Sequence, residues 1–304
     1  MSGLARASGP RPRAAPTAPA TPATPAAPAA PAEDKLTPIT APLARRMDCV
    51  CVFVNDDLQA DTVRQLAEGG TGLVALRCAG FDRVDLTACR EHGVTVARVP
   101  AYSPGAIAEH AVGLMLALNR KLHRAYSRTR EGNFALDGLV GFNMEGRTVG
   151  VVGTGGIGAR VCEILRLGFG CRVLAYDVGP SERLAGIGVE YRGLDEVLAG
   201  SDVVSLHVPL LPSTERMIDS QAIRKMRRGA MLINVSRGGL IDTDALIRGL
   251  EDGQLGAVGL DVYEQESSVF FEDWSATTER RMSTWDRRLS LLTSFPNVIV
   301  TPHR

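Results

Sequence analysis

The sequence lacks an excess of either charge and any apolar run long enough to cross a membrane. Its 304 residues include 34 basic and 34 acidic side chains, so the formal net charge is zero. A neutral chain offers no electrostatic footprint for nucleic acid or for an anionic membrane surface. The longest apolar run, from Ala111 to Leu118, is far shorter than the about 20 residues that span a bilayer. We therefore expect a soluble globular protein that binds neither nucleic acid nor membrane.

Paired cysteine motifs are also missing. None of the six cysteines belongs to a CxxC pair or stands near a histidine at the spacing of a metal site. This pattern predicts reduced, buried thiols, no metal site, and a reducing compartment such as the cytoplasm. The amino terminus has no apolar segment and so is not a secretory signal, although its arginines and its lack of acidic residues leave an organelle transit peptide open.

The first residues differ from the rest in composition. Residues 1–32 hold 12 Ala, 8 of the 17 Pro and three Arg, with no acidic residue. Such a tract has too few large apolar side chains to offset the entropy lost on ordering, so we predict a disordered or polyproline-like tail over residues 1–34. The remaining 272 residues carry 31 basic and 34 acidic side chains, a net charge of −3, and suffice for two domains with real cores.

From residue 147 onward, short apolar runs alternate with helical patterns. This alternation predicts βα units and a mostly parallel sheet, because continuous Val, Ile and Leu runs are typical of strands covered on both faces. The predicted strands are Thr148–Val152, Arg172–Tyr176, Val203–His207, Met231–Val235, Val258–Val262 and Val298–Thr301. The predicted helices cover residues 156–168, 194–199, 219–226 and 243–252, the last preceded by Asp242 as an N-cap. We expect a six-stranded, doubly wound α/β domain over residues 103–300.

A second, smaller α/β domain is expected over residues 35–102. Its predicted strands are Cys49–Val54, Leu73–Arg77 and Val94–Val99, with helical segments between them. We place the join of the two domains at Ala101–Pro104. One long helix should follow, from Ile107 to about Thr129, because its apolar residues recur at i, i+3, i+4 and i+7.

A glycine motif marks the first turn of the larger domain. Gly153, Gly155 and Gly158 in GTGGIG stand where the strand TVGVV ends and a helix begins. Glycines at these positions permit a tight turn, close approach of the backbone to a pyrophosphate, and close packing of helix on strand. The next strand ends in Asp177, 19 residues after Gly158, where a carboxylate accepts hydrogen bonds from ribose hydroxyls and repels a 2′-phosphate. This context predicts a Rossmann domain that binds NAD rather than NADP.

Three charged residues follow predicted strands in the second half: Arg237, Glu266 and His303. Ligands of open parallel sheets bind beyond the carboxyl ends of the strands, so these chain-distant residues can meet in one site. Reduction of a 2-oxo acid needs a cation for the carboxylate, a proton donor at the carbonyl oxygen, and hydride from a nicotinamide. The planar fork of Arg237 suits the first role, and His303, partnered by Glu266, suits the second.

Several sequence blocks together resemble the D-isomer-specific 2-hydroxyacid dehydrogenases, and most closely their D-lactate dehydrogenase branch. The blocks are VFVND, ALRCAGF, PAYSPGAIAEHAVGLMLALNRK, GNFALDGLVGFNMEG, GTGGIG, NVSRGGLID, GLDVYEQE and FPNVIVTPH, and the resemblance runs from about Leu36 to the last residue. It implies that Arg237, Glu266 and His303 are the catalytic residues, 29 and 37 residues apart in sequence. The 37-residue spacing from Glu266 to His303 resembles that of the D-lactate branch.

The same resemblance implies further site residues and a homodimer built through the cofactor domain, using the helix after residue 107. The cofactor NAD would be contacted, beside the three glycines of the motif, at Gly156, Ile157, Asp177, Val208, Pro209, Val235, Ser236 and Asp261. Backbone amides near Ala79 and Gly80 would hold the substrate carboxylate, with Tyr102 either lining the pocket or packing at the hinge. His207, in the strand-end HVP, is a second acid/base candidate, but a histidine of the core or cofactor pocket is the preferred interpretation.

Both chain ends depart from the family pattern. Family chains open with a βα unit where this chain has the Pro/Ala tract before Lys35, and they continue beyond the catalytic histidine, whereas this chain stops at Arg304. The resemblance therefore implies an incomplete, flavodoxin-like smaller domain, with residues 301–304 beginning the return to it. We expect unpaired strand edges and impaired closure over the nicotinamide. Three functions stay open: a D-lactate dehydrogenase, a dehydrogenase of another 2-hydroxy acid, and an NAD-binding module without turnover.

Overall fold

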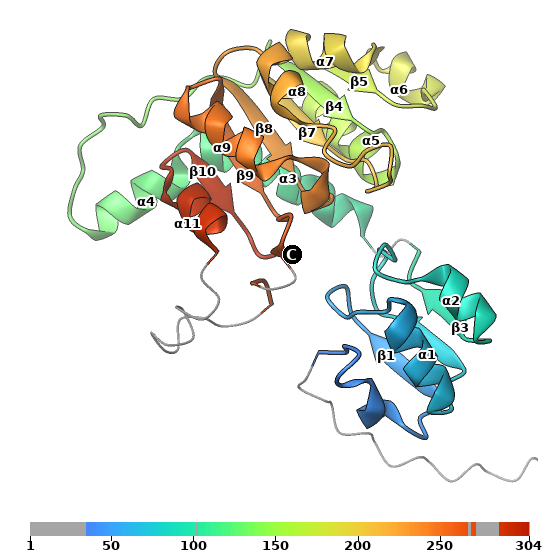
Figure 1. Cartoon of the computed structure of the whole chain (residues 1–304). Coiled ribbons are helices and arrows are strands. Elements are labelled where there is room, and N and C mark those ends of the chain that lie inside the picture. Colours follow the sequence, from blue (N-terminus) through green and yellow to red (C-terminus); the bar gives the residue numbers. More distant parts are fainter. Residues whose placement is uncertain (1–34, 101–102, 267–268, 272–285, 304) are drawn as a thin grey trace, which may run out of the picture.

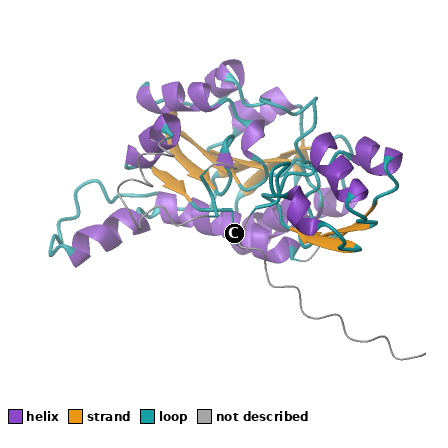
Figure 2. Ribbon diagram, turned by 60° about the horizontal axis from the view of Figure 1, so that its bottom comes forward, coloured by secondary structure: helices purple, strands orange, loops and turns teal. Residues whose placement is uncertain are grey.

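Two parallel β-sheets with flanking helices form the fold of the computed structural model, which describes residues 35–100, 103–266, 269–271 and 286–303. Figure 1 shows the smaller sheet with its helices in blue and teal, and the larger sheet in the later colours of the chain. In Figure 2 the strands of the larger sheet lie between layers of helices. This architecture confirms the predicted α/β class. The predicted tail, residues 1–34, and Tyr102 lie outside the described residues.

The smaller sheet has the strand order β1-β2-β3. Its strands are β1 (Cys49–Val52), β2 (Leu73–Leu76) and β3 (Thr95–Arg98), and they are accompanied by the 3-10 turn η1 (Ala41–Ala44) and the helices α1 (Ala60–Glu68) and α2 (Leu86–Glu91). Each strand lies within its predicted range. Val52 is buried, whereas Cys49 and Cys51, on the other face of β1, are exposed. Within the described residues, the helices thus leave this face of β1 uncovered.

The larger sheet has the strand order β10-β9-β8-β7-β4-β5-β6, and all of its pairings are parallel. Its strands are β4 (Thr148–Val152), β5 (Arg172–Tyr176), β6 (Glu190–Tyr191), β7 (Val203–Leu206), β8 (Ala230–Asn234), β9 (Leu255–Leu260) and β10 (Val298–Val300). The sequence predicts six of these strands. The seventh, β6, corrects that prediction, because its two residues form no apolar run that the sequence could reveal.

Helices cover both faces of the larger sheet, as a doubly wound fold requires. They are α3 (Pro104–Asn119), α4 (Leu122–Arg130), α5 (Gly156–Glu163), the π-helical turn η2 (Ile164–Gly168), α6 (Glu182–Gly186), α7 (Leu194–Gly200), α8 (Ser220–Lys225), the 3-10 turn η3 (Gly238–Leu240), α9 (Thr243–Glu251) and α11 (Arg287–Ser294). Neighbouring residues of β7 belong to different cores. Val203 packs with side chains of α3 and α5, whereas Val204 packs with side chains of α7, α8 and α9.

The predicted single helix from Ile107 to Thr129 is wrong, because it is broken at Lys121. Lys121 has a φ of +54°, a left-handed conformation that separates the end of α3 from the start of α4. Asn119, the last residue of α3, is held by a contact from outside the helix. The buried Asn119 side chain donates to the Phe142 carbonyl and accepts from the Phe142 amide, both at 2.8 Å. This tertiary contact overrides the helical periodicity.

A membrane-crossing helix is not found in the part of the chain that the structure describes.

Candidate active site

The glycine motif forms the turn from β4 into α5. Gly153 has a φ of +92°, which favours glycine, and its amide donates to the Tyr176 carbonyl at 2.8 Å. A Cβ on Gly158 would lie 1.9 Å from the Gly153 carbonyl oxygen, so the first turn of α5 packs directly on the loop. A Cβ on Gly155, the N-cap of α5, would meet nothing within 4 Å. The loop therefore offers the open, amide-lined N-terminus that fits a dinucleotide pyrophosphate.

Asp177, just beyond β5, lies beside this loop. Its Oδ2 accepts from the Thr154 amide (2.5 Å) and hydroxyl (3.1 Å), and its Oδ1 accepts from the Gly179 amide (2.9 Å). Burial raises the pKa of this carboxyl, but the hydrogen bonds from Gly179 and Thr154 outweigh burial and hold the pKa below its usual value. Asp177 is therefore ionised at neutral pH, as a ribose-binding carboxylate must be.

The other predicted cofactor residues gather at the same edge. Gly156 and Ile157 form the first turn of α5. The remaining five follow the carboxyl ends of the adjacent strands β7, β8 and β9: Val208, Pro209, Val235, Ser236 and Asp261. The Ser236 hydroxyl joins two of these strand ends, because it donates to the Leu206 carbonyl at 3.0 Å. The structure thus brings the predicted cofactor contacts together along one edge of the sheet.

His303 and Glu266 form a hydrogen-bonded pair beyond β9 and β10. His303 Nδ1 lies 3.0 Å from Glu266 Oε1, and both side chains are about one-fifth exposed, at 18% and 20%. A carboxylate only accepts, so His303 Nδ1 carries the proton, and the opposite ring nitrogen, Nε2, can exchange a proton with a substrate. The Tyr263 amide donates to Glu266 Oε2 at 3.1 Å and fixes the carboxylate.

Aromatic rings border this pair. The Phe271 ring lies 5.8 Å from the His303 ring, and the Phe53 ring of the smaller sheet's domain packs edge-on against Phe271 at 5.6 Å. Phe271 has a φ of +69°, an uncommon conformation for a bulky residue. The two phenylalanines therefore form an apolar wall beside the imidazole.

Arg237, after β8, faces the smaller domain. Its Nε donates to Asp82 Oδ1 at 2.9 Å, and its Nη1 donates to the Ser236 carbonyl at 2.8 Å. A Cβ on Gly80 would lie 1.8 Å from Arg237 Nη2, so the guanidinium rests on the Gly80 backbone. Arg237 and Gly80, two predicted substrate contacts, are thus brought together. The neighbouring Ala79 uses its carbonyl to accept from Arg98 Nη1 at 2.8 Å.

The surroundings of the His207 imidazole do not suit a role in proton transfer. Its Nε2 lies 2.8 Å from the Ser205 hydroxyl, and within the described structure its buried Nδ1 has no hydrogen-bond partner. Burial lowers the pKa of His207 to about 4, so the imidazole is neutral at physiological pH. This environment agrees with a core or cofactor-pocket histidine.

Sequence analysis does not identify three residues of the site: Asp82, His110 and Thr301. Asp82 pairs with Arg237 across 155 residues of chain. His110 reaches Thr301 across 191 residues. Their side chains are common surface types, and nothing in one sequence marks pairs so far apart.

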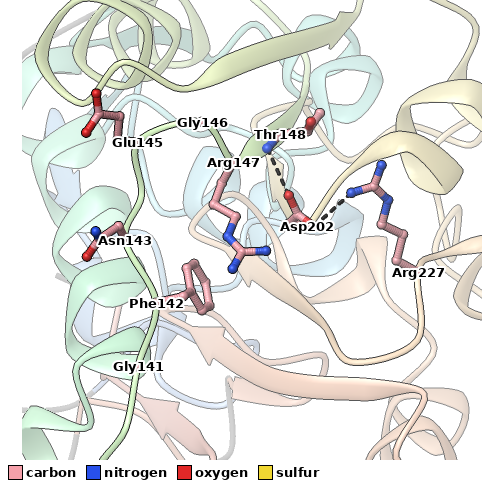
Figure 3. Close-up of a pocket in the computed structure, with 9 residues that line it drawn as sticks. All are labelled: Gly141, Phe142, Asn143, Glu145, Gly146, Arg147, Thr148, Asp202 and Arg227. Carbon is pink, nitrogen blue, oxygen red and sulfur yellow. Dashed lines mark hydrogen bonds and ion pairs between the residues drawn. The ribbon is translucent and has the colours of Figure 1, made fainter.

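A concavity of about 710 Å³ lies elsewhere (Figure 3). It opens at the amino ends of β4 and β7, where Asp202 accepts from the Thr148 amide (2.9 Å) and from Arg227 (2.8 Å). Arg147 stacks on the Phe142 ring with its guanidinium 4.7 Å from the ring centre. This hollow faces away from the carboxyl ends of the strands and is not part of the candidate active site.

The class that the fold and the site define is an NAD-dependent oxidoreductase, because the glycine turn, the Asp177 carboxylate and the His303–Glu266 pair share one edge of a Rossmann sheet. Comparison with known proteins agrees. Residues 112–304 match the family described as D-isomer specific 2-hydroxyacid dehydrogenase, NAD binding domain. The chain belongs to the D-isomer specific 2-hydroxyacid dehydrogenases, and its cofactor is NAD.

Curated relatives and solved structures carry matching names. 2-Hydroxyacid dehydrogenase homolog 1 of Schizosaccharomyces pombe is 49% identical over 272 residues, which cover 90% of this chain and 80% of the relative. D-lactate dehydrogenase of Escherichia coli is 46% identical over 269 residues, covering 88% and 80%. A solved structure described as the pyruvate reductase of Chlamydomonas reinhardtii is 55% identical with a TM-score of 0.82, covering 90% of this chain and 80% of that one.

The close packing at the glycine turn leads to a prediction about cofactor binding. Gly158→Ala should weaken NADH binding by at least about 10-fold, because the new Cβ would push α5 away from the loop and displace the amides that face the pyrophosphate. The dissociation constant is measured by NADH fluorescence titration. Gly186→Ala, where a Cβ meets nothing within 4 Å, is the matched control and should bind NADH normally. Unchanged affinity in Gly158→Ala would show that the loop is not the cofactor site.

Proposed function

We propose that the chain interconverts pyruvate and D-lactate with NAD as the redox partner. The observation that carries the proposal is the His303–Glu266 pair, held at 3.0 Å beyond two neighbouring strand ends, with Arg237 at the end of the next strand. A proton donor and a carboxylate-binding cation at one edge are what reduction of a 2-oxo acid requires. Bound NADH supplies the hydride that reaches the substrate carbonyl carbon.

Each of the three side chains has one task in the proposed reduction. Arg237, which pairs with Asp82 in this structure, pairs with the substrate carboxylate when substrate binds, beside the Gly80 backbone on which its guanidinium rests. His303 gives the proton on Nε2 to the carbonyl oxygen as the alcohol forms. Glu266 accepts from Nδ1, so it fixes the orientation of the ring and leaves Nε2 for the substrate. In the direction of oxidation, His303 takes the hydroxyl proton back.

The aromatic wall favours pyruvate among the possible substrates. Phe271, next to His303, and Phe53, packed on Phe271, present apolar surface where a substituent on the 2-oxo acid would lie. A methyl group gains from such surface, whereas a phosphoryl group would lose hydration against the Phe271 ring. A larger apolar substituent needs more room and is the second candidate.

Substrate preference can be measured directly. With NADH, kcat/KM should be highest for pyruvate and lowest for 3-phosphohydroxypyruvate, with hydroxypyruvate and phenylpyruvate between them, for the reason just given. The rate is followed by loss of NADH absorbance. A preference for another acid would assign a different 2-hydroxyacid dehydrogenase, and NADH binding without oxidation by any of the four acids would favour the binding module.

The acid/base role of His303 leads to a separate prediction. His303→Ala should lower kcat for pyruvate reduction by about 100- to 10,000-fold, the usual effect of losing a positioned acid, while NADH affinity changes little. Steady-state kinetics and NADH titration measure the two quantities. His92→Ala, which removes an exposed histidine at the end of α2, is the control and should leave both unchanged. A strong loss of NADH binding in His303→Ala would contradict the assigned role.

We also propose a homodimer formed through α4 and the segment that follows it. This region extends away from the larger sheet (Figure 1). It carries large apolar side chains with high exposure: Tyr126 (63%), Phe134 (75%), Leu136 (79%) and Val140 (85%). Large exposed apolar side chains that recur along one segment mark interfaces, and a second copy would remove them from water.

Light scattering after gel filtration tests the dimer. The unaltered chain should have twice its 32.4 kDa chain mass, and Leu136→Asp should shift it to a monomer by placing a charge in the interface. Ile39→Asp changes a side chain that is 89% exposed on the smaller domain and should leave the dimer intact. A monomeric mass for the unaltered chain at micromolar concentration would exclude the dimer.

For localisation, we propose a reducing compartment such as the cytoplasm, supported by the six free cysteines. A fluorescent fusion of the full chain would separate this from organelle import directed by residues 1–34.

A further inference from the structure

A side-chain cluster beside the proposed active site links α3 to the ends of β9 and β10. His110 Nε2, on the second turn of α3, lies 3.0 Å from Thr301 Oγ1 and 3.3 Å from Asp261 Oδ1. The Thr301 hydroxyl in turn donates to Asp261 Oδ1 at 2.5 Å. Neither His110 nor Thr301 has a task in the reduction described above.

The direction of each hydrogen bond follows from the donor inventory. The Asp261 carboxylate only accepts, and the single proton of the Thr301 hydroxyl is committed to it. The Thr301 oxygen must therefore accept from His110, so Nε2 of His110 carries a proton. His110 therefore donates to Thr301, and its Nε2 lies 3.3 Å from Asp261 Oδ1. An amide N–H at the same place could replace this donor.

The cluster holds two groups on which the proposed reaction depends. The Asp261 side chain is only 4% exposed and stands at the cofactor edge of the sheet. Thr301 lies two residues before His303, and its carbonyl accepts from the His303 amide at 3.1 Å. The backbone amides of Asp261 and Thr301 are tied to β8 and β9, through the carbonyls of Asn234 (2.9 Å) and Leu260 (2.8 Å). His110 adds the only side-chain tie from α3 that the described residues show to this pair.

We propose that His110 is a positioning residue that fixes the Asp261 carboxylate and the Thr301–His303 turn for hydride and proton transfer. This inference rests on the proposed function. Without His110, the Thr301 hydroxyl that donates to the nearly buried Asp261 carboxylate loses its own donor and can turn toward other partners. A displacement of about 1 Å at the reacting groups can lower the rate of transfer about 100-fold. The effect of His110 should therefore appear in kcat more than in cofactor affinity.

Three variants separate positioning from general stability. His110→Phe keeps the ring but removes the donor, and it should lower kcat for pyruvate reduction by roughly 10- to 100-fold. His110→Gln restores an N–H donor at similar reach and should recover most of that loss. Glu109→Gln changes the exposed neighbour on the same helix and should behave like the unaltered chain. NADH titration and thermal unfolding are measured for all three.

Two further measurements complete the experiment: a double-mutant cycle with Asp261→Asn, and the kinetic isotope effect on hydride transfer. If His110 acts through Asp261, adding His110→Phe to Asp261→Asn should lower kcat little further, because the group that His110 orients has already been altered. NADH deuterated at the transferred position should slow His110→Phe more than the unaltered chain, since transfer itself becomes limiting.

The outcomes are distinct. Additive losses in the cycle, equal losses in His110→Phe and His110→Gln, or a loss that follows unfolding temperature alone would overturn the positioning role. If the unaltered chain turns over pyruvate and His110→Phe does so at the same rate, this inference fails while the proposed function stands. If the unaltered chain binds NADH but reduces no 2-oxo acid, the proposed function fails and the inference fails with it.

Discussion

Parallel pairing of the strands is the constraint on which the rest of this structure depends. Because β4, β7, β8, β9 and β10 all run in one direction, each delivers the residues that follow it to the same edge of the sheet. The glycine turn, Ser236, Arg237, Asp261 and the Glu266–His303 pair share that edge for this reason alone. Segments that are distant in sequence can therefore bind a cofactor and a small acid together at this edge.

Much of this arrangement can be predicted from the sequence, because its causes are local. A strand covered on both faces needs a continuous apolar run, so Thr148–Val152 and Arg172–Tyr176 are predicted to the residue. The glycines at 153, 155 and 158 require a specific turn, and the structure shows the close approach at Gly158 that excludes a side chain. The meeting of Glu266 with His303 follows from parallel strand ends together with the chemistry of reduction.

The remainder could not be predicted because its causes are tertiary. Lys121 breaks a helix whose apolar periodicity continues past it, since the buried Asn119 amide is bound to the Phe142 backbone. Asp82 lies against Arg237, and His110 lies against Asp261, only because two folded units or two layers meet there. Single residues of common types, with partners more than a hundred positions away, leave no pattern in one chain.

The stereochemistry of the product tests the central claim most directly. The purified full chain is incubated with pyruvate and NADH, and the lactate is resolved by chiral chromatography while NADH loss is followed. If Arg237 anchors the carboxylate and His303 protonates the oxygen while hydride arrives from one fixed side, the lactate should be a single enantiomer, equimolar with the NADH consumed. Membership in the D-isomer specific family predicts that this enantiomer is D. L-lactate, a racemic product, or NADH binding without any lactate would contradict this account.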